Sequence, residues 1–149
     1  MSQSARQIAV ALLARRDHSR QELQIKLRQK AFESLEIEQA LDYCESNQYL
    51  CDERYAQLLI KSHISKGYGP AKIQQSLYQK GVSKSIVSEV LQQTDCDWFL
   101  LAKSRALKKF AGKPIADAKD KAKRIRFLMG QGFSYDQVAF ALEYDPYET

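Results

Sequence analysis

Hydrophobic residues recur along the chain with the spacing of α-helices. Near the N-terminus, Ala5, Ile8, Ala9, Leu12 and Leu13 follow the i, i+3, i+4, i+7, i+8 pattern of one helix face. The same spacing returns in residues 37–44 and 55–63. We find no convincing alternation of apolar and polar residues of the kind that marks a β-strand. The pattern therefore predicts an all-α protein.

Three segments of the chain resemble one another when they are aligned. They begin at Ser19, Gly69 and Asp120, so successive segments are 50 and 51 residues apart. Apolar residues coincide at several aligned positions: Leu27, Leu77 and Leu128, then Ile37, Val87 and Val138, then Leu41, Leu91 and Leu142. A period of this length indicates an array of like structural units that bury their apolar faces against one another.

Each aligned segment predicts a helix, a short turn and a second helix. A further helix is expected before each pair, at residues 4–16, 52–66 and 97–110. The sequence therefore predicts an elongated, curved array of three tandem three-helix repeats resembling helix-turn-helix units, with about nine helices in all. We place the repeats at residues 1–50, 51–95 and 96–149, the last ending in a short acidic tail to which we assign no role.

Residues typical of helix ends mark the expected boundaries. Gly81 and Gly132 suit the left-handed conformation that closes a helix, whereas Ala31 at the aligned position should be costlier. Candidate N-caps are Ser19, Asp52, Ser83, Asp97 and Ser134, and the capping-box partners of the first and last are Glu22 and Gln137.

The neighbouring residues Asp17, His18 and Ser19 invite comparison with a catalytic triad. Members of such triads come from separate elements, whereas these three are adjacent on a link between helices. Ser19 and Glu22 instead form a capping-box signature before an apolar run, so we interpret this stretch as a helix start.

Composition narrows the classes of function. The chain has 149 residues, of which 44% are hydrophobic and 28% charged, and only six are glycine. We find no phosphate-binding glycine loop, no H-E-x-x-H and no C-x-x-C pair, and the three cysteines read as free thiols. No stretch approaches the ~18 apolar residues of a membrane span. We expect a cytoplasmic binding protein, not an enzyme, with no metal, no cofactor and no membrane association.

Charge is distributed unevenly. The net charge is +5, but residues 103–126 alone carry ten bases and two acids, a local +8. The last 23 residues carry four acids and no base. Such a basic segment could face an anionic partner, or it could be an ordinary solvated helix surface. The second helices of the first and third pairs are acidic or lack bases, which argues against sequence-specific reading of a DNA major groove.

The candidate contacts with a partner or with DNA come mainly from the first helices of the pairs. They are Arg20, Arg28, Lys66, Tyr68, Lys72, Lys119, Lys121, Lys123, Arg124 and Arg126. Lys119, Lys123 and Arg126 should share one helix face. Arg124 stands where the other repeats have Leu23 and Ile73, which suggests a less buried or tilted helix. Tyr68, between two glycines, is the tyrosine we most expect to be exposed.

These features resemble the RecX family, bacterial regulators of the recombinase RecA. The resemblance runs from about Ala9 to Leu142. It is carried by L-L-A-R-R-D-H-S-R-Q-E-L, Y-L-C-D-E-R-Y-A, K-G-Y-G-P-A-K-I-Q-Q-S-L-Y-Q-K-G-V and R-F-L-M-G-Q-G-F-S-Y-D-Q-V. These motifs are mostly caps and turns, and they are specific through their order and spacing.

The resemblance implies an all-helical crescent of three three-helix repeats and a role in DNA recombination and repair and in the SOS response. It implies binding to the RecA–DNA filament, suppression of its ATPase, strand-exchange and co-protease activities, and weak binding to single- or double-stranded DNA by a protein that we expect to be monomeric. It transfers no catalytic residue. The alternative from the residues alone is a non-sequence-specific nucleic-acid-binding protein.

Overall fold

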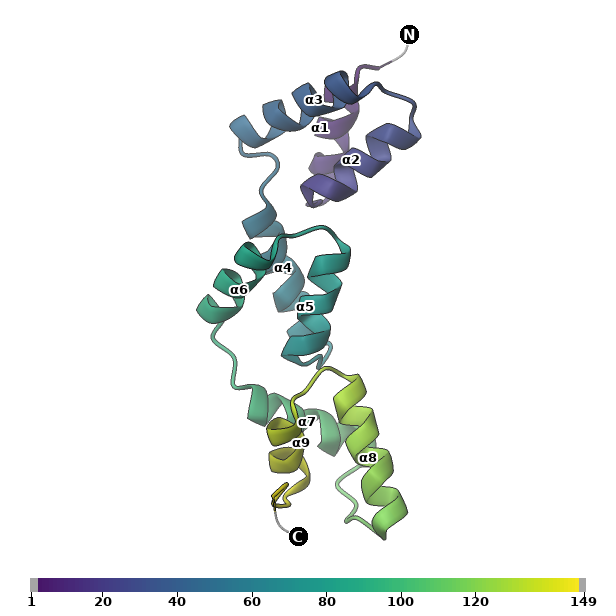
Figure 1. Ribbon diagram of the computed structural model, residues 1–149, viewed down its shortest axis with the longest axis vertical. Helices are drawn as coiled ribbons and strands as arrows, with labels where there is room; N and C mark the ends of the chain where they lie inside the picture. The colour runs from purple at the N-terminus through teal and green to yellow at the C-terminus, as the bar shows by residue number, and fades with distance from the viewer. Residues whose placement is uncertain (1–2, 148–149) are drawn as a thin grey trace. The chain divides into compact units, whose positions relative to one another are not determined.

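The computed structural model describes residues 3–147, and within them the chain forms nine α-helices and no strand (Figure 1). The helices are α1 (Ala5–Arg15), α2 (Arg20–Gln29), α3 (Ser34–Ser46), α4 (Asp52–Ser65), α5 (Pro70–Gln79), α6 (Lys84–Gln93), α7 (Trp98–Phe110), α8 (Ala118–Gly130) and α9 (Tyr135–Leu142). The all-α prediction is confirmed. The expected first helix of each repeat, now α1, α4 and α7, begins and ends within one residue of its predicted position.

The chain divides into two compact units. One contains Met1–Leu59 and Leu77–Val90, and the other contains Ile60–Ser76 and Leu91–Thr149. The division falls within α4, α5 and α6, so each unit combines a terminal repeat with part of the middle repeat.

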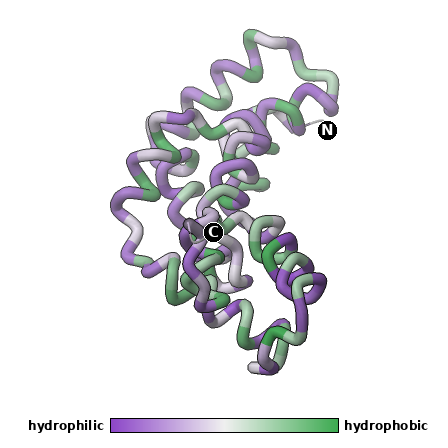
Figure 2. The backbone as a smooth tube through the Cα atoms, turned by 60° about the horizontal axis from the view of Figure 1, so that its bottom comes forward, coloured by the Kyte–Doolittle hydropathy of each residue, from purple (hydrophilic) through white to green (hydrophobic). Residues whose placement is uncertain are grey.

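The apolar faces of the helices form a core in each unit. In the first unit, Leu23, Leu27 and Leu41 are fully buried among α1, α2 and α3. In the second unit, Leu128 and Val138 are fully buried among α7, α8 and α9. Hydrophobic and hydrophilic residues alternate along the helices, as expected where one face of each helix is buried (Figure 2).

Most predicted caps are confirmed. Ser19 with Glu22 and Ser134 with Gln137 form complete capping boxes. The Asp97 carboxylate accepts hydrogen bonds from the first backbone N–H groups of α7, and the Ser83 hydroxyl accepts one from the first turn of α6. The stretch around Ser19 is therefore a helix start, as its sequence indicated.

Asp52 differs from the prediction. It is the first residue of α4, and its carboxylate accepts the backbone N–H of Arg20 at 2.9 Å. Arg20 opens α2, whose first N–H groups have no partner within their own helix. Asp52 thus serves the beginning of a helix 32 residues away in sequence, which a local capping rule does not detect.

The turns between paired helices confirm the predicted left-handed residues and explain why one of them is alanine. Gly81 and Gly132 have φ of 86° and 99°, and Ala31 has φ of 68°. A Cβ at Gly81 would collide with the Gln21 side chain, and one at Gly132 would come within 2.5 Å of the Lys72 Cβ. Ala31 is exposed, so its methyl group is accommodated at the cost of backbone strain alone.

These turns join successive repeats through backbone groups. In the first unit, the Ser19 hydroxyl donates to the Lys80 carbonyl, which lies just before Gly81. In the second unit, the Gly69 N–H donates to the Gln131 carbonyl at 2.7 Å and the Ala71 N–H donates to the Gly132 carbonyl at 3.0 Å. The turn of one repeat therefore packs on the start of the first paired helix of the preceding repeat.

Candidate interaction surface

An exposed row of cations lies along α8. Lys119, Lys123 and Arg126 are all exposed and follow i, i+4, i+7 spacing, which places them on one face of the helix. Lys121 is half-buried, and its Nζ lies 4.1 Å from the centre of the Tyr144 ring. These three side chains of the predicted set are exposed together on one helix.

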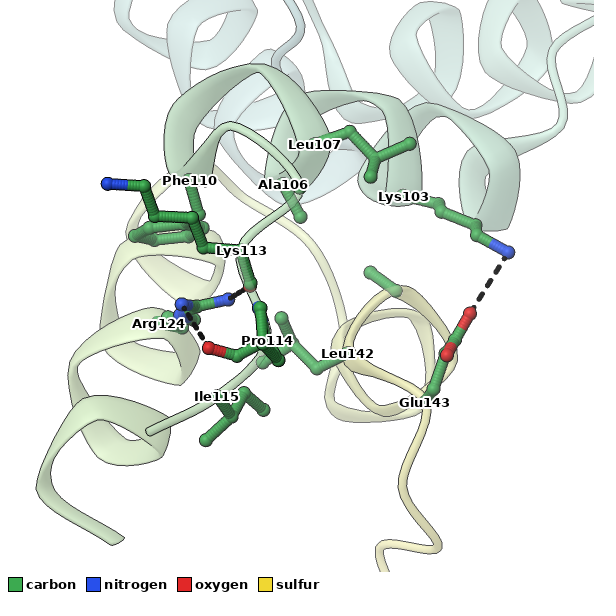
Figure 3. A pocket seen from close by; sticks show the side chains of 12 residues that line it. Lys103, Ala106, Leu107, Phe110, Lys113, Pro114, Ile115, Arg124, Leu142 and Glu143 are labelled. Atoms are coloured by element: carbon green, nitrogen blue, oxygen red, sulfur yellow. Dashed lines mark hydrogen bonds and ion pairs between the residues drawn. The ribbon is translucent and has the colours of Figure 1, made fainter. Parts of the chain in front are cut away.

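Arg124 does not belong to that row. We expected it to mark a less buried or a tilted helix, but the residue itself is buried, as are the aligned Leu23 and Ile73. Only 8% of Arg124 is exposed. Its guanidinium donates to the carbonyls of Lys113 at 2.8 Å and Pro114 at 3.3 Å and lies 4.7 Å from the centre of the Phe110 ring (Figure 3). It also pairs with Asp120 at 3.1 Å. The buried guanidinium is stabilised because these groups balance its charge and accept hydrogen bonds from its N–H groups.

Arg124 also borders a cavity of about 420 Å³ in the third repeat. The cavity is lined by α7, the loop that follows it, α8 and the end of α9 (Figure 3). Lys103 on α7 pairs across it with Glu143 at 3.3 Å. Two of the lining cations, Lys103 and Arg124, are thus paired within the protein.

Arg20 is likewise engaged within the protein. Its guanidinium contacts three carboxylates of α3, Glu38 at 2.9 Å, Asp42 at 3.0 Å and Glu45 at 2.7 Å. Partial burial by itself disfavours the charged form, but the hydrogen bonds to these carboxylates outweigh it and raise the pKa of Arg20 above its usual value. Arg20 therefore holds α2 against α3.

The remaining predicted residues lie in different settings. Arg28 and Lys66 are exposed. Tyr68 is half-buried, contrary to our expectation of an exposed ring, because it packs between His63 and Lys72. The rings of Tyr68 and His63 are 5.2 Å apart, and the Lys72 Nζ lies 4.0 Å from the centre of the Tyr68 ring. Lys72 thus makes a cation–π contact within the chain.

Helix α7 contains none of the predicted contact residues. This helix carries Lys103, Arg105, Lys108 and Lys109 and no acidic residue. Lys108 and Lys109 are exposed. The signal was present in the basic run of residues 103–126, but charge alone did not distinguish α7 from α8.

Fold and surface together define a class of protein. The described residues form helical repeats with exposed, basic helix faces, and they contain no group of three or more His, Cys, Asp or Glu side chains placed to hold a metal ion. Nor does this part of the chain contain a helix with the length and apolar character to cross a membrane. Helical repeats with exposed, charged faces are typical of a repeat protein that binds a macromolecule.

The chain belongs to the RecX family. Three family models match it in order: "RecX, first three-helix domain" at residues 5–44, "RecX, second three-helix domain" at residues 52–91 and "RecX, third three-helix domain" at residues 97–142. The prediction of three tandem three-helix repeats is thereby confirmed, as is the resemblance drawn from the sequence motifs.

Relatives and solved structures agree with this assignment. The chain is 42% identical over 142 residues to the regulatory protein RecX of Vibrio parahaemolyticus, covering 95% of this chain and 92% of the relative. It is 44% identical over 139 residues to that of Vibrio vulnificus, with 93% and 91% covered. The fold is similar to the crystal structure of RecX from Lactobacillus salivarius, with a TM-score of 0.80, 20% identity, and 93% and 92% of the two chains covered.

Proposed function

We propose that this protein regulates RecA by binding the RecA–DNA filament and suppressing its ATPase, strand-exchange and co-protease activities. Membership of a family of regulatory proteins supports a binding protein in place of an enzyme. The observation that carries the proposal further is the exposed row of Lys119, Lys123 and Arg126, a surface suited to an acidic protein groove or to phosphates. In this proposal the protein acts in the cytoplasm as a monomer.

Within that surface, α8 is the main contact. Lys66 is exposed in the same unit, and Lys121 is half-buried there. Arg28 is exposed in the first unit and is a separate candidate contact. Arg20 and Arg124 are omitted, because their guanidinium groups are held by carboxylates and carbonyls of the protein itself. Tyr68 and Lys72 support the second repeat through their mutual contact.

A second function is favoured by the charge of the α7–α8 segment. A local +8 can bind phosphates without regard to base sequence, so the protein would be a non-specific nucleic-acid binder that affects RecA only by covering DNA. Such binding weakens steeply with salt, because each neutralised phosphate releases a counterion.

RecA ATPase activity on single-stranded DNA separates the two functions. The protein is added at concentrations well below those of RecA and of DNA binding sites. Strong loss of ATPase activity under these conditions supports a filament regulator that acts through protein contacts. Loss that begins only when the DNA is saturated, and that disappears as salt rises, supports the nucleic-acid binder and contradicts the regulator.

Charge reversal tests the surface. We expect Lys119→Glu, Lys123→Glu and Arg126→Glu together to weaken filament binding while far-UV circular dichroism stays unchanged. The matched control reverses three exposed cations elsewhere, Arg15, Lys61 and Lys84, so that the net charge changes equally. Equal binding by the two triple variants would exclude α8 as the contact.

A further inference from the structure

A small recess in the second unit gathers cations that lie far apart in sequence. It has a volume of about 120 Å³, space for about four water molecules at their liquid volume. It lies where the end of α4 meets α7. Its polar lining consists of Ser65, Lys66, Ser104, Arg105 and Lys108, and no acidic residue lines it.

Arg105 is held in an unusual way. Gly67, which follows α4 with φ of 83°, leaves space for its side chain, since a Cβ at Gly67 would lie 2.6 Å from the Arg105 Cδ. The guanidinium carbon lies 5.1 Å from the centre of the Phe127 ring. The Arg105 Nε is buried and has no hydrogen-bond partner in the described structure. Buried donors without a partner are uncommon in native proteins and call for an explanation.

The two lysines at the recess are also without counter-ions. Lys66 and Lys108 are exposed, and neither forms an ion pair with a described residue. By contrast, Lys103, on the same helix as Lys108, forms an ion pair with Glu143. Neighbouring cations repel each other, so an anion in the recess would stabilise all three at once.

We propose that this recess binds a phosphate group. The Arg105 guanidinium offers a planar set of donors that matches phosphate oxygens, and Lys66 and Lys108 add positive charge at the same recess. The hydroxyls of Ser65 and Ser104 can donate to the remaining oxygens. The phosphate is either a phosphodiester of a nucleic-acid backbone or a free phosphate ion. The inference rests on the second function proposed above, to which it assigns a defined site, and it requires no RecA.

The first arm of the test uses a fluorescein-labelled thymidine oligonucleotide and no RecA, with fluorescence anisotropy as the readout. Arg105→Gln should weaken binding about tenfold, as expected for loss of a charge-assisted hydrogen bond. It should also reduce the slope of log K against log salt by about 0.7, the value for one phosphate of a single strand. Lys108→Gln, an exposed position that leaves folding intact, should act in the same direction, and Lys84→Gln serves as the control of equal charge.

The second arm titrates inorganic phosphate into the protein at constant ionic strength set with chloride. If phosphate enters the recess, the Arg105 Nε–H resonance in a ¹H–¹⁵N spectrum should shift, and the shift should reach a plateau as phosphate is added. Saturable shift together with an Arg105-dependent oligonucleotide affinity assigns the site to a nucleic-acid backbone. Shift with unchanged oligonucleotide affinity assigns it to free phosphate. No shift, with wild-type oligonucleotide affinity and salt slope in both variants, overturns the proposal and leaves the RecA experiment unaffected.

Discussion

The packing of one repeat on the next can be tested at a single glycine. Replacing Gly132 with alanine adds one methyl group in the turn between α8 and α9. The residue has φ of 99°, and the added Cβ would lie 2.5 Å from both the backbone nitrogen and the Cβ of Lys72. The change therefore strains the backbone and forces the turn away from the start of α5.

Two effects of the substitution lower the stability, and a third partly offsets them. The left-handed conformation costs a residue with a Cβ about 1–2 kcal/mol. Forcing an extra methyl group into a filled space costs about 1–3 kcal/mol. Alanine restricts the unfolded chain, which returns about 0.4–1 kcal/mol. We therefore expect Gly132→Ala to lower the free energy of unfolding by about 1–5 kcal/mol.

Two other glycines separate these contributions. Gly112 has φ of 68° and nothing within 4 Å of an added Cβ, so alanine there costs the backbone strain alone. Gly130 lies in the last turn of α8, with no positive φ and open space, so alanine there should stabilise the helix by up to about 1 kcal/mol. Urea unfolding followed by the fluorescence of Trp98, the single tryptophan, reports on the unit that contains all three.

The relative stabilities of the three alanine variants test this packing. Stability should rise for Gly130→Ala, fall modestly for Gly112→Ala and fall most for Gly132→Ala. If Gly132→Ala lowers the free energy of unfolding no more than Gly112→Ala does, the close approach of the turn to Lys72 does not contribute to stability. The proposed importance of this turn for packing one repeat on the next would then be wrong.

Two further predictions concern buried charged or titratable groups. Burial, and then the charges of Arg16 and Lys26, lower the pKa of His18, so stability should be full above its ordinary value of 6.5 and should fall as the pH drops below it. Unfolding free energies at pH 7.5 and 5.5 should show this loss, and His18→Gln should remove it. Arg124→Ala should lower the free energy of unfolding by about 1–3 kcal/mol and expose the loop of residues 111–117 to proteinase K, because two carbonyls lose their donor. Unchanged cleavage would show that this side chain does not hold the loop.

Features that depend on nearby residues were determined by the sequence. The spacing that aligned Leu27, Leu77 and Leu128 predicted three buried positions, and all three are fully buried. Ser19 predicted a helix start because a hydroxyl caps an N–H only three residues away. Helical periodicity and capping act over one or two turns, so a single sequence contains the information needed.

Features that depend on distant partners were decided by the tertiary structure. The sequence offered Arg20 and Arg124 as binding residues, because it does not show that the carboxylates of α3 or the carbonyls after α7 lie beside them. It also left Arg105 as one cation in a basic run, whereas folding places it against Gly67, 38 residues earlier in the chain. The sequence by itself thus determined which segments are helices and how they repeat. The fold decided which charges are satisfied, because a charge is neutralised by the groups that surround it in space, and for Arg20 and Arg124 many of those come from other parts of the chain.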